Sequence, residues 1–106
     1  MPAIGHVRRT DKGFEGSLNT PSIKSRITIV TNTAKASEGQ PDYLVVVDGA
    51  EVGGGWVRRS RTSGADYVSL SLAAPEFGPR RLYANLGKAA GQDDPDVFAI
   101  IWNPAD

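Results

Sequence analysis

The sequence predicts an all-β domain: a small antiparallel barrel or sandwich of about seven or eight meandering strands. Apolar and polar residues alternate in short runs, which is the pattern of half-buried strands. Glycine and proline, which occur 12 and 7 times, separate these runs and favour tight turns. No window of helical length shows a convincing 3.6-residue period, and the best helical alternative is a turn within 87–92.

The size and composition of the chain fit one folded domain, 1–106. The sequence is 40% apolar and 23% charged, a balance that argues against wholesale disorder. No apolar run reaches the length of a membrane helix, and no secretory hydrophobic region stands at the beginning. With no cysteine, the chain has no disulfide or thiolate chemistry. We therefore expect a cytoplasmic protein that does not contact membranes.

Four strands are expected in the first half of the chain, at 4–10, 14–20, 23–30 and 43–47. Asp-Lys-Gly at 11–13 predicts a tight turn between the first two, with glycine where a left-handed residue is needed. The third strand shows the clearest alternation, with Ile27 and Ile29 on one face. Small polar residues at 33–41 predict a loop. The continuous apolar run at 43–47 predicts a strand that is buried on both faces or lies at a barrel closure.

Four more strands are expected in the second half, at 51–60, 67–72, 80–86 and 97–102. Asp48-Gly49 is the strongest hairpin signal in the chain. The three glycines at 53–55 predict a β-bulge or a close approach by another backbone or a bulky ring. They do not form a phosphate-binding loop, since no lysine and helix follow them. Phe77, between two prolines, is expected either to plug one end of the barrel or to be an exposed protein-binding anchor.

The formal net charge of zero hides an alternation of charged segments. Residues 1–35 and 58–88 each carry a net charge of +4, whereas 36–57 and 89–106 each carry −4. These charges cancel at long range, so strong steering of a polyanion is not expected. A local basic face forms only if the two positive segments meet in space.

A set of short motifs extends along most of the chain. In order, they are Ile4-Gly5, Gly13-Phe14-x-Gly16, Val30-x-Asn32, Pro41-Asp42-Tyr43, Gly49-x-Glu51-x-Gly53, Trp56 followed by basic residues, Asp66-Tyr67-Val68-Ser69-Leu70-Ser71-Leu72, Tyr83-Ala84-Asn85-Leu86 and Ile101-Trp102. In this combination the chain resembles the bacterial domain-of-unknown-function family numbered 736. The resemblance implies a compact β domain encoded on mobile genetic elements, and it brings no established activity or catalytic residues.

Residues for catalysis or metal binding are sparse. His6 is the only histidine, and no Gly-x-Ser-x-Gly elbow accompanies it for nucleophilic catalysis. One histidine without cysteine argues against a zinc site. Asp93, Asp94 and Asp96 lack the glycine and distal glutamate of a calcium loop and fit a solvated turn better. We therefore expect no enzymatic activity, no metal and no cofactor.

Basic and aromatic residues form the one candidate binding face. On ideal strands, side chains of one face would come from Trp56, Arg58 and Ser60, from Tyr67, Ser69 and Ser71, and from Arg81, Tyr83 and Asn85. Single-stranded nucleic acids bind to such surfaces, since bases stack on aromatic rings while arginines meet phosphates. The structural alternative is that Trp56 and Tyr83 lie in the core or at its rim and the arginines solubilise an outer face.

These observations lead to two functional hypotheses. The first is a non-enzymatic binding or adaptor domain that associates with an unknown protein, or with a second copy of itself, through sheet edges. The alternative is weak binding of single-stranded nucleic acid by the basic-aromatic face, with an affinity limited by the zero net charge.

Overall fold

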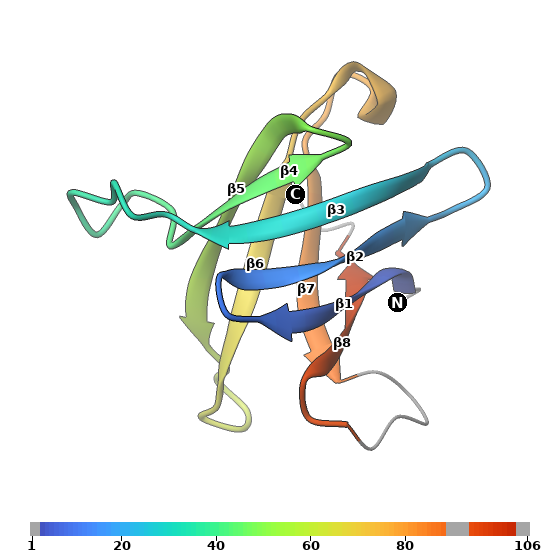
Figure 1. The fold of residues 1–106 in the computed structure, drawn as a ribbon. Helices are drawn as coiled ribbons and strands as arrows, with labels where there is room; N and C mark the ends of the chain where they lie inside the picture. Colours follow the sequence, from blue (N-terminus) through green and yellow to red (C-terminus); the bar gives the residue numbers. More distant parts are fainter. Residues whose placement is uncertain (1–2, 89–93, 104–106) are drawn as a thin grey trace.

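The computed structural model describes residues 3–88 and 94–103, which form eight β-strands and one short 3-10 helix. The elements are β1 (Ala3–Thr10), β2 (Gly13–Asn19), β3 (Lys24–Thr31), β4 (Tyr43–Val47), β5 (Ala50–Arg59), β6 (Asp66–Leu72), η1 (Pro75–Phe77), β7 (Leu82–Lys88) and β8 (Val97–Trp102). Each strand pairs antiparallel with the next, and β1 also pairs with β8, so the sheet closes into a barrel (Figure 1). The all-β meander is confirmed, and of the two expected architectures the barrel is formed.

The interior of the barrel is filled by the apolar residues that alternate along its strands. Ile27 and Ile29 of β3 are completely buried, as are Leu70 and Leu72 of β6. Each of these side chains stabilises the fold by roughly 1.5–3 kcal/mol through burial alone. An eight-stranded barrel is just wide enough for side chains to fill it. The period-two pattern therefore identified the inward face of these strands correctly.

The continuous apolar run in β4 is only partly buried. Val45 is completely buried, whereas Leu44 and Val46 on either side of it are half-buried. Burial on both faces is wrong here, because a single-layered barrel has one apolar interior and β4 has solvent on its other side. A place at the barrel closure is wrong as well, since β4 lies inside the meander and the closing pair is β1 with β8.

The hairpin between β4 and β5 has the predicted two-residue turn. Asp48 and Gly49 have positive φ angles of 50° and 86°, as a type I′ turn requires. The Asp48 carboxylate accepts a hydrogen bond from the backbone N–H of Arg26, and the Asp48 N–H donates to the Arg26 carbonyl oxygen. The turn is thereby fixed to the end of β3 beyond its ladder with β4.

A β-bulge lies at the start of the glycine run, as predicted. Val45 of β4 is opposite Gly53, but Val46 is opposite Glu51, so Val52 is the extra residue. Bulges bend the strand that carries them and increase its twist. The bend brings β5 from its pairing with β4 onto β6 and gives the barrel one of its corners.

The end of the chain differs slightly from the expected strand bounds. β7 ends at Lys88 rather than at residue 86, because Gly87 and Lys88 continue its ladder with β8. The first residues of the helical alternative at 87–92 are therefore strand. The rest of that segment lies outside the described residues, as does Asp93.

Closure of the barrel changes the expected route of association. Every strand in the described ranges has a hydrogen-bonded neighbour on both sides. Pairing of two sheets needs a row of unpaired backbone groups, which closure removes. The expected partner contact through sheet edges has no free edge to use.

The close approach of β5 and β6 at Gly53 gives a stability prediction. An added Cβ at Gly53 would lie 1.9 Å from the carbonyl oxygen of Ser71, and the clash is with backbone that cannot rotate away. We expect Gly53→Ala to lower the free energy of unfolding by at least about 2 kcal/mol, measured by denaturant titration. Gly39→Ala is the matched control, since nothing lies within 4 Å of that site and its φ is not positive. Equal stability of the two variants would contradict the close approach of the β5 and β6 backbones at Gly53.

Candidate functional site

Most of the predicted site residues lie on the outer surface of β5, β6 and β7. Trp56 of β5 is opposite Ser69 of β6, and Ser69 is opposite Asn85 of β7. Arg58 is opposite Tyr67 one row further along. Residues opposite one another point to the same side of a sheet, and in these rows that side is the outside. The structure therefore brings together residues that the sequence separates by as many as 29 positions.

Arg81 joins this surface from the segment before β7. Its Nε donates a hydrogen bond of 2.6 Å to the hydroxyl of Ser71, which is opposite Tyr83. Ser71 lies on the same face as Tyr67 and Ser69, as the alternation along this strand predicted. We call this surface the β5–β7 face; it consists of Trp56, Arg58, Tyr67, Ser69, Ser71, Arg81, Tyr83 and Asn85.

Ser60 is the one predicted site residue that does not lie on the β5–β7 face. It follows the end of β5, and its hydroxyl oxygen accepts hydrogen bonds from the backbone N–H groups of Thr62 and Ser63. Its own N–H donates to the carbonyl oxygen of Ala65. Ser60 thus organises the turn between β5 and β6. Sequence reasoning missed this role because it extended the strand one residue too far.

Trp56 holds the long loop between β3 and β4, residues 32–42, against the barrel. Its indole Nε1 donates a hydrogen bond of 3.2 Å to the carbonyl oxygen of Gly39. The ring lies over Gly54, where an added Cβ would be 3.3 Å from the indole and 2.8 Å from Pro41. The half-buried indole is therefore a tether for the loop, and the prediction of close packing at the glycine run is confirmed.

Asp42 completes this attachment at the point where β4 and β5 separate. One carboxylate oxygen accepts from the ammonium of Lys35, and the other accepts from the backbone N–H of Val57 at 2.9 Å. The Asp42 N–H donates to the carbonyl oxygen of Gly55. The Lys35 hydrogen bond, followed by the one from Val57, holds the pKa of Asp42 below its ordinary value of 3.8. The carboxylate thus satisfies a strand N–H that has no partner in β4.

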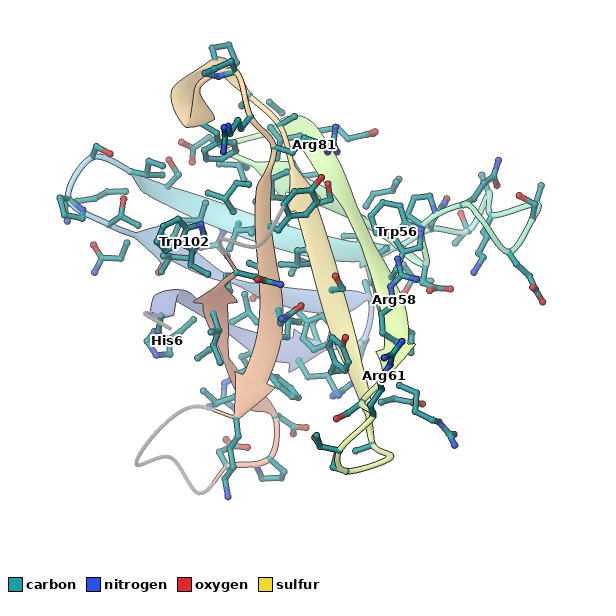
Figure 2. All side chains as sticks on the ribbon, turned by 180° about the vertical axis from the view of Figure 1, so that it is seen from behind. His6, Trp56, Arg58, Arg61, Arg81 and Trp102 are labelled. Carbon is teal, nitrogen blue, oxygen red and sulfur yellow. The ribbon has the colours of Figure 1, made fainter. Side chains whose placement is uncertain are left out.

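The arginines of the described residues fall into two groups. Four of them approach carboxylates: Arg8 with Asp94 at 2.8 Å, and Arg9 with Asp96, Arg26 with Glu15 and Arg59 with Asp66 at 3.7 Å each. Arg58, Arg61, Arg80 and Arg81 are exposed and form no ion pair with any described residue. Figure 2 shows Arg58, Arg61 and Arg81 with Trp56 on the side of the barrel that carries β5, β6 and the start of β7.

The residues considered for catalysis or metal binding have other surroundings. His6 is exposed on the outer side of β1, away from the β5–β7 face (Figure 2). Asp94 accepts hydrogen bonds from Arg8 and from the backbone N–H of Asp96, and Asp96 lies near Arg9. Within the described ranges, no group of three or more acidic or histidine side chains is placed to hold a metal ion.

Phe77 lies at the other end of the barrel from the Asp42 attachment. It is half-buried and packs against the apolar core cluster, as expected for a plug. Ile23 packs beside this core as well, and both residues line two hollows that open at this end.

A comparison with protein-family models matches residues 3–105 to the family described as protein of unknown function, DUF736. The chain belongs to this family. No curated protein and no solved structure matches the chain. No helix within the described residues is long and apolar enough to cross a membrane.

The motifs that carried the resemblance to DUF736 acquire a physical meaning in this barrel. Asp42 caps β5, Pro41 packs on Gly54, and Trp56 binds the loop carbonyl of Gly39. Asn32 closes the other end of the loop, since its side-chain amide donates to the Pro41 carbonyl oxygen at 2.9 Å. Part of the motif set therefore serves to attach one loop.

The lowered pKa of Asp42 makes the attachment sensitive to pH. A carboxyl whose pKa is lower in the folded state stabilises the fold above its unfolded pKa of about 3.8, and this contribution is lost as the pH falls through the folded value. We expect Asp42→Ala to lower the free energy of unfolding by about 1–2 kcal/mol at pH 7 and by less near pH 3, which is below the unfolded pKa of 3.8 and therefore in the range where this contribution is being lost.

Denaturant unfolding at the two pH values checks this expectation. Asp66→Ala is the control, because Asp66 is exposed, lies 3.7 Å from Arg59 and should change stability by less than about 0.5 kcal/mol. A loss that is equal for both variants, or independent of pH, would show that the Asp42 carboxylate does not hold the loop.

Proposed function

We propose that this member of DUF736 is a non-enzymatic binding module that holds single-stranded nucleic acid on its β5–β7 face. The observation that carries the proposal is the distribution of arginine partners. Arginines on β1 and β3 approach carboxylates, whereas Arg58 and Arg81 on the β5–β7 face pair with none among the described residues. Unpaired guanidinium groups beside tyrosines suit a ligand with phosphates and flat rings.

The side chains of the face supply the interactions that such a ligand needs. Tyr67 and Tyr83 are half-buried, so each has an anchored ring for a base to stack on. Arg81 is already held by its hydrogen bond to Ser71, so its side chain loses less conformational freedom when it binds a phosphate. Asn85 and Ser69, opposite each other between the two tyrosine rows, offer hydrogen bonds to base edges or sugars.

Trp56 has a different part in this proposal from the one expected from the sequence. Its indole N–H is used by Gly39 and its ring covers Gly54. We therefore assign base stacking to Tyr67 and Tyr83, and assign to Trp56 the placement of the loop that borders the face.

Single strands fit this surface better than a duplex. In a duplex the base faces are stacked on one another, so tyrosine rings of a sheet cannot reach them. The formal net charge of zero supports an affinity that is modest. The adaptor hypothesis loses its main physical argument, since its edge-pairing route has no free strand edge in the barrel.

We also propose that the protein acts in the bacterial cytoplasm and derives from a mobile genetic element. The support for the location is a chain without cysteine, which suits a reducing compartment. The support for the origin is the character of the family that the chain resembles.

Salt titration of oligonucleotide binding tests the proposed face. Two phosphate contacts give a log–log slope of affinity against salt of roughly −1.4, from about −0.7 per contact on a single strand. We expect replacement of Arg58 and Arg81 by glutamine to flatten this slope, whereas Tyr83→Ala weakens binding by about 1–3 kcal/mol and leaves the slope nearly unchanged. Anisotropy of a fluorescent oligothymidylate at several salt concentrations measures both effects.

The matched control replaces Arg8 and Arg26 by glutamine, which removes the same charge from arginines that already have carboxylate partners. Binding and slope should stay close to those of the unmodified protein. No binding at low salt, or an equal response to the two double replacements, would sink the proposal of a defined nucleic-acid face.

A further inference from the structure

The barrel end near the turn between β5 and β6 contains a hollow lined by aromatic rings. Its volume is about 200 Å³, and its lining includes Phe14, Tyr43, Tyr67 and Phe98, with Arg9 and Asp66 at its charged positions. The volume is below the range of about 300–1,000 Å³ that holds drug-sized ligands, so the hollow suits one small ring system. Neither the residues that attach the loop, Trp56 and Asp42, nor the arginines proposed to bind phosphate, Arg58 and Arg81, line this hollow.

The rings around this hollow are held in fixed orientations. Phe14 meets Phe98 edge to face at 5.4 Å between centroids, and it meets Tyr43 at 5.7 Å with planes inclined by 62°. Phe14 is buried in the core, so the arrangement is anchored from the inside of the barrel. A planar guest would therefore meet a preformed aromatic surround, which lowers the entropic cost of binding it.

Arg9 adds a cation to this surround in an unusual place. It follows Val7 on the inward side of β1, and its guanidinium carbon lies 5.0 Å from the Phe14 centroid and 5.3 Å from that of Phe98. Its approach to Asp96 is long, at 3.7 Å, and its side chain remains 52% exposed. The guanidinium is thus held beside the rings while its exposed part keeps N–H donors for a ligand in the hollow.

Asp66 supplies the opposite charge at the same hollow. It is opposite Arg59 at the end of the β5–β6 ladder, with 3.7 Å between the closest charged atoms and 63% of its side chain exposed. Its carboxylate can thus exchange this weak contact for hydrogen bonds to a ligand. The hollow thus presents the N–H donors of the Arg9 guanidinium and the two acceptor oxygens of the Asp66 carboxylate.

We propose that this hollow binds one guanine base of the single strand that runs along the β5–β7 face; the inference rests on the proposed function. Guanine has two adjacent N–H donors that match the two oxygens of a carboxylate, and two adjacent acceptors, O6 and N7, that match a guanidinium. Adenine offers no such pair of donors. Arg9 and Asp66, which line the same hollow among aromatic residues, together favour guanine over adenine.

The hollow is continuous with the β5–β7 face through one residue. Tyr67 lines the hollow and is opposite Arg58 on the face. A strand whose phosphate meets Arg58 has its neighbouring base next to the mouth of the hollow. Val57 also lines the hollow and is 45% exposed, so a bound base would cover apolar surface of its side chain.

The experiment compares two oligothymidylates that differ at one central position, which holds guanine in one and adenine in the other. In anisotropy titrations, the strand with guanine should bind at least about fivefold more tightly than the strand with adenine. Asp66→Asn should abolish that preference and leave the affinity for plain oligothymidylate unchanged. Asp48→Asn is the matched control, because Asp48 lies in the turn at the opposite end of the barrel and asparagine tolerates its positive φ.

A second variant avoids any dependence on the charge of Asp66. Val57→Trp fills the mouth of the hollow from an exposed position and leaves the buried core intact. It should also remove the guanine preference, and guanosine added alone should shift the NMR ring signals of Phe98 and Tyr43 only in the unmodified protein.

The outcomes separate the two proposals. Equal affinity for the guanine and adenine strands, or a guanine preference that persists in both variants, overturns the hollow as a guanine site while oligonucleotide binding by the face stands. Absence of any oligonucleotide binding overturns the proposed function and this inference with it.

Discussion

Pairing of β1 with β8 is the contact on which the rest of the molecule depends. It joins the two ends of a meander whose other ladders are all between sequence neighbours, and it leaves no strand with an unpaired side among the described residues. A closed sheet of eight strands must bend sharply, which places glycine where backbones meet and a bulge at Val52. Closure also divides every strand into an inward apolar side and an outward polar side. The proposed binding surface, the β5–β7 face, is one part of that outward side.

The outward side is not uniform, and the difference is electrostatic. Around β1 and β3, arginine and carboxylate groups approach one another and leave little net field. On the β5–β7 face, the guanidinium groups of Arg58 and Arg81 stand among tyrosines and hydroxyls and form no ion pair with a described residue, whereas Arg59 at the end of β5 approaches Asp66. The alternating charged segments of the sequence thus become a spatial division. The zero total charge conceals this division, since it describes the sum and not the surface.

Period-two patterning predicted most of the fold and much of the candidate face. It placed Leu70 inside and put Ser69 on the opposite side, and both placements depend only on the alternation of side chains along a strand. It failed where a side chain serves a partner distant in the sequence. Nothing near Trp56 in the chain indicates that its indole binds Gly39, and nothing near Arg9 indicates that its guanidinium lies over two rings. Such roles depend on the closure of the barrel, which local pattern does not encode.

The order of the ladders has a consequence for how the chain assembles. Hairpins between consecutive strands close short loops, so most of the native pairing is available at low entropic cost. Only the β1–β8 ladder requires the two ends of the domain to find each other, and Ala3 lies opposite Ile101 when they do. The strands therefore form a ring in which the starting point of the chain is arbitrary. A version whose old ends are joined by a short linker, with new ends at the exposed Asp48-Gly49 turn, would retain the same set of ladders in a circularly permuted order.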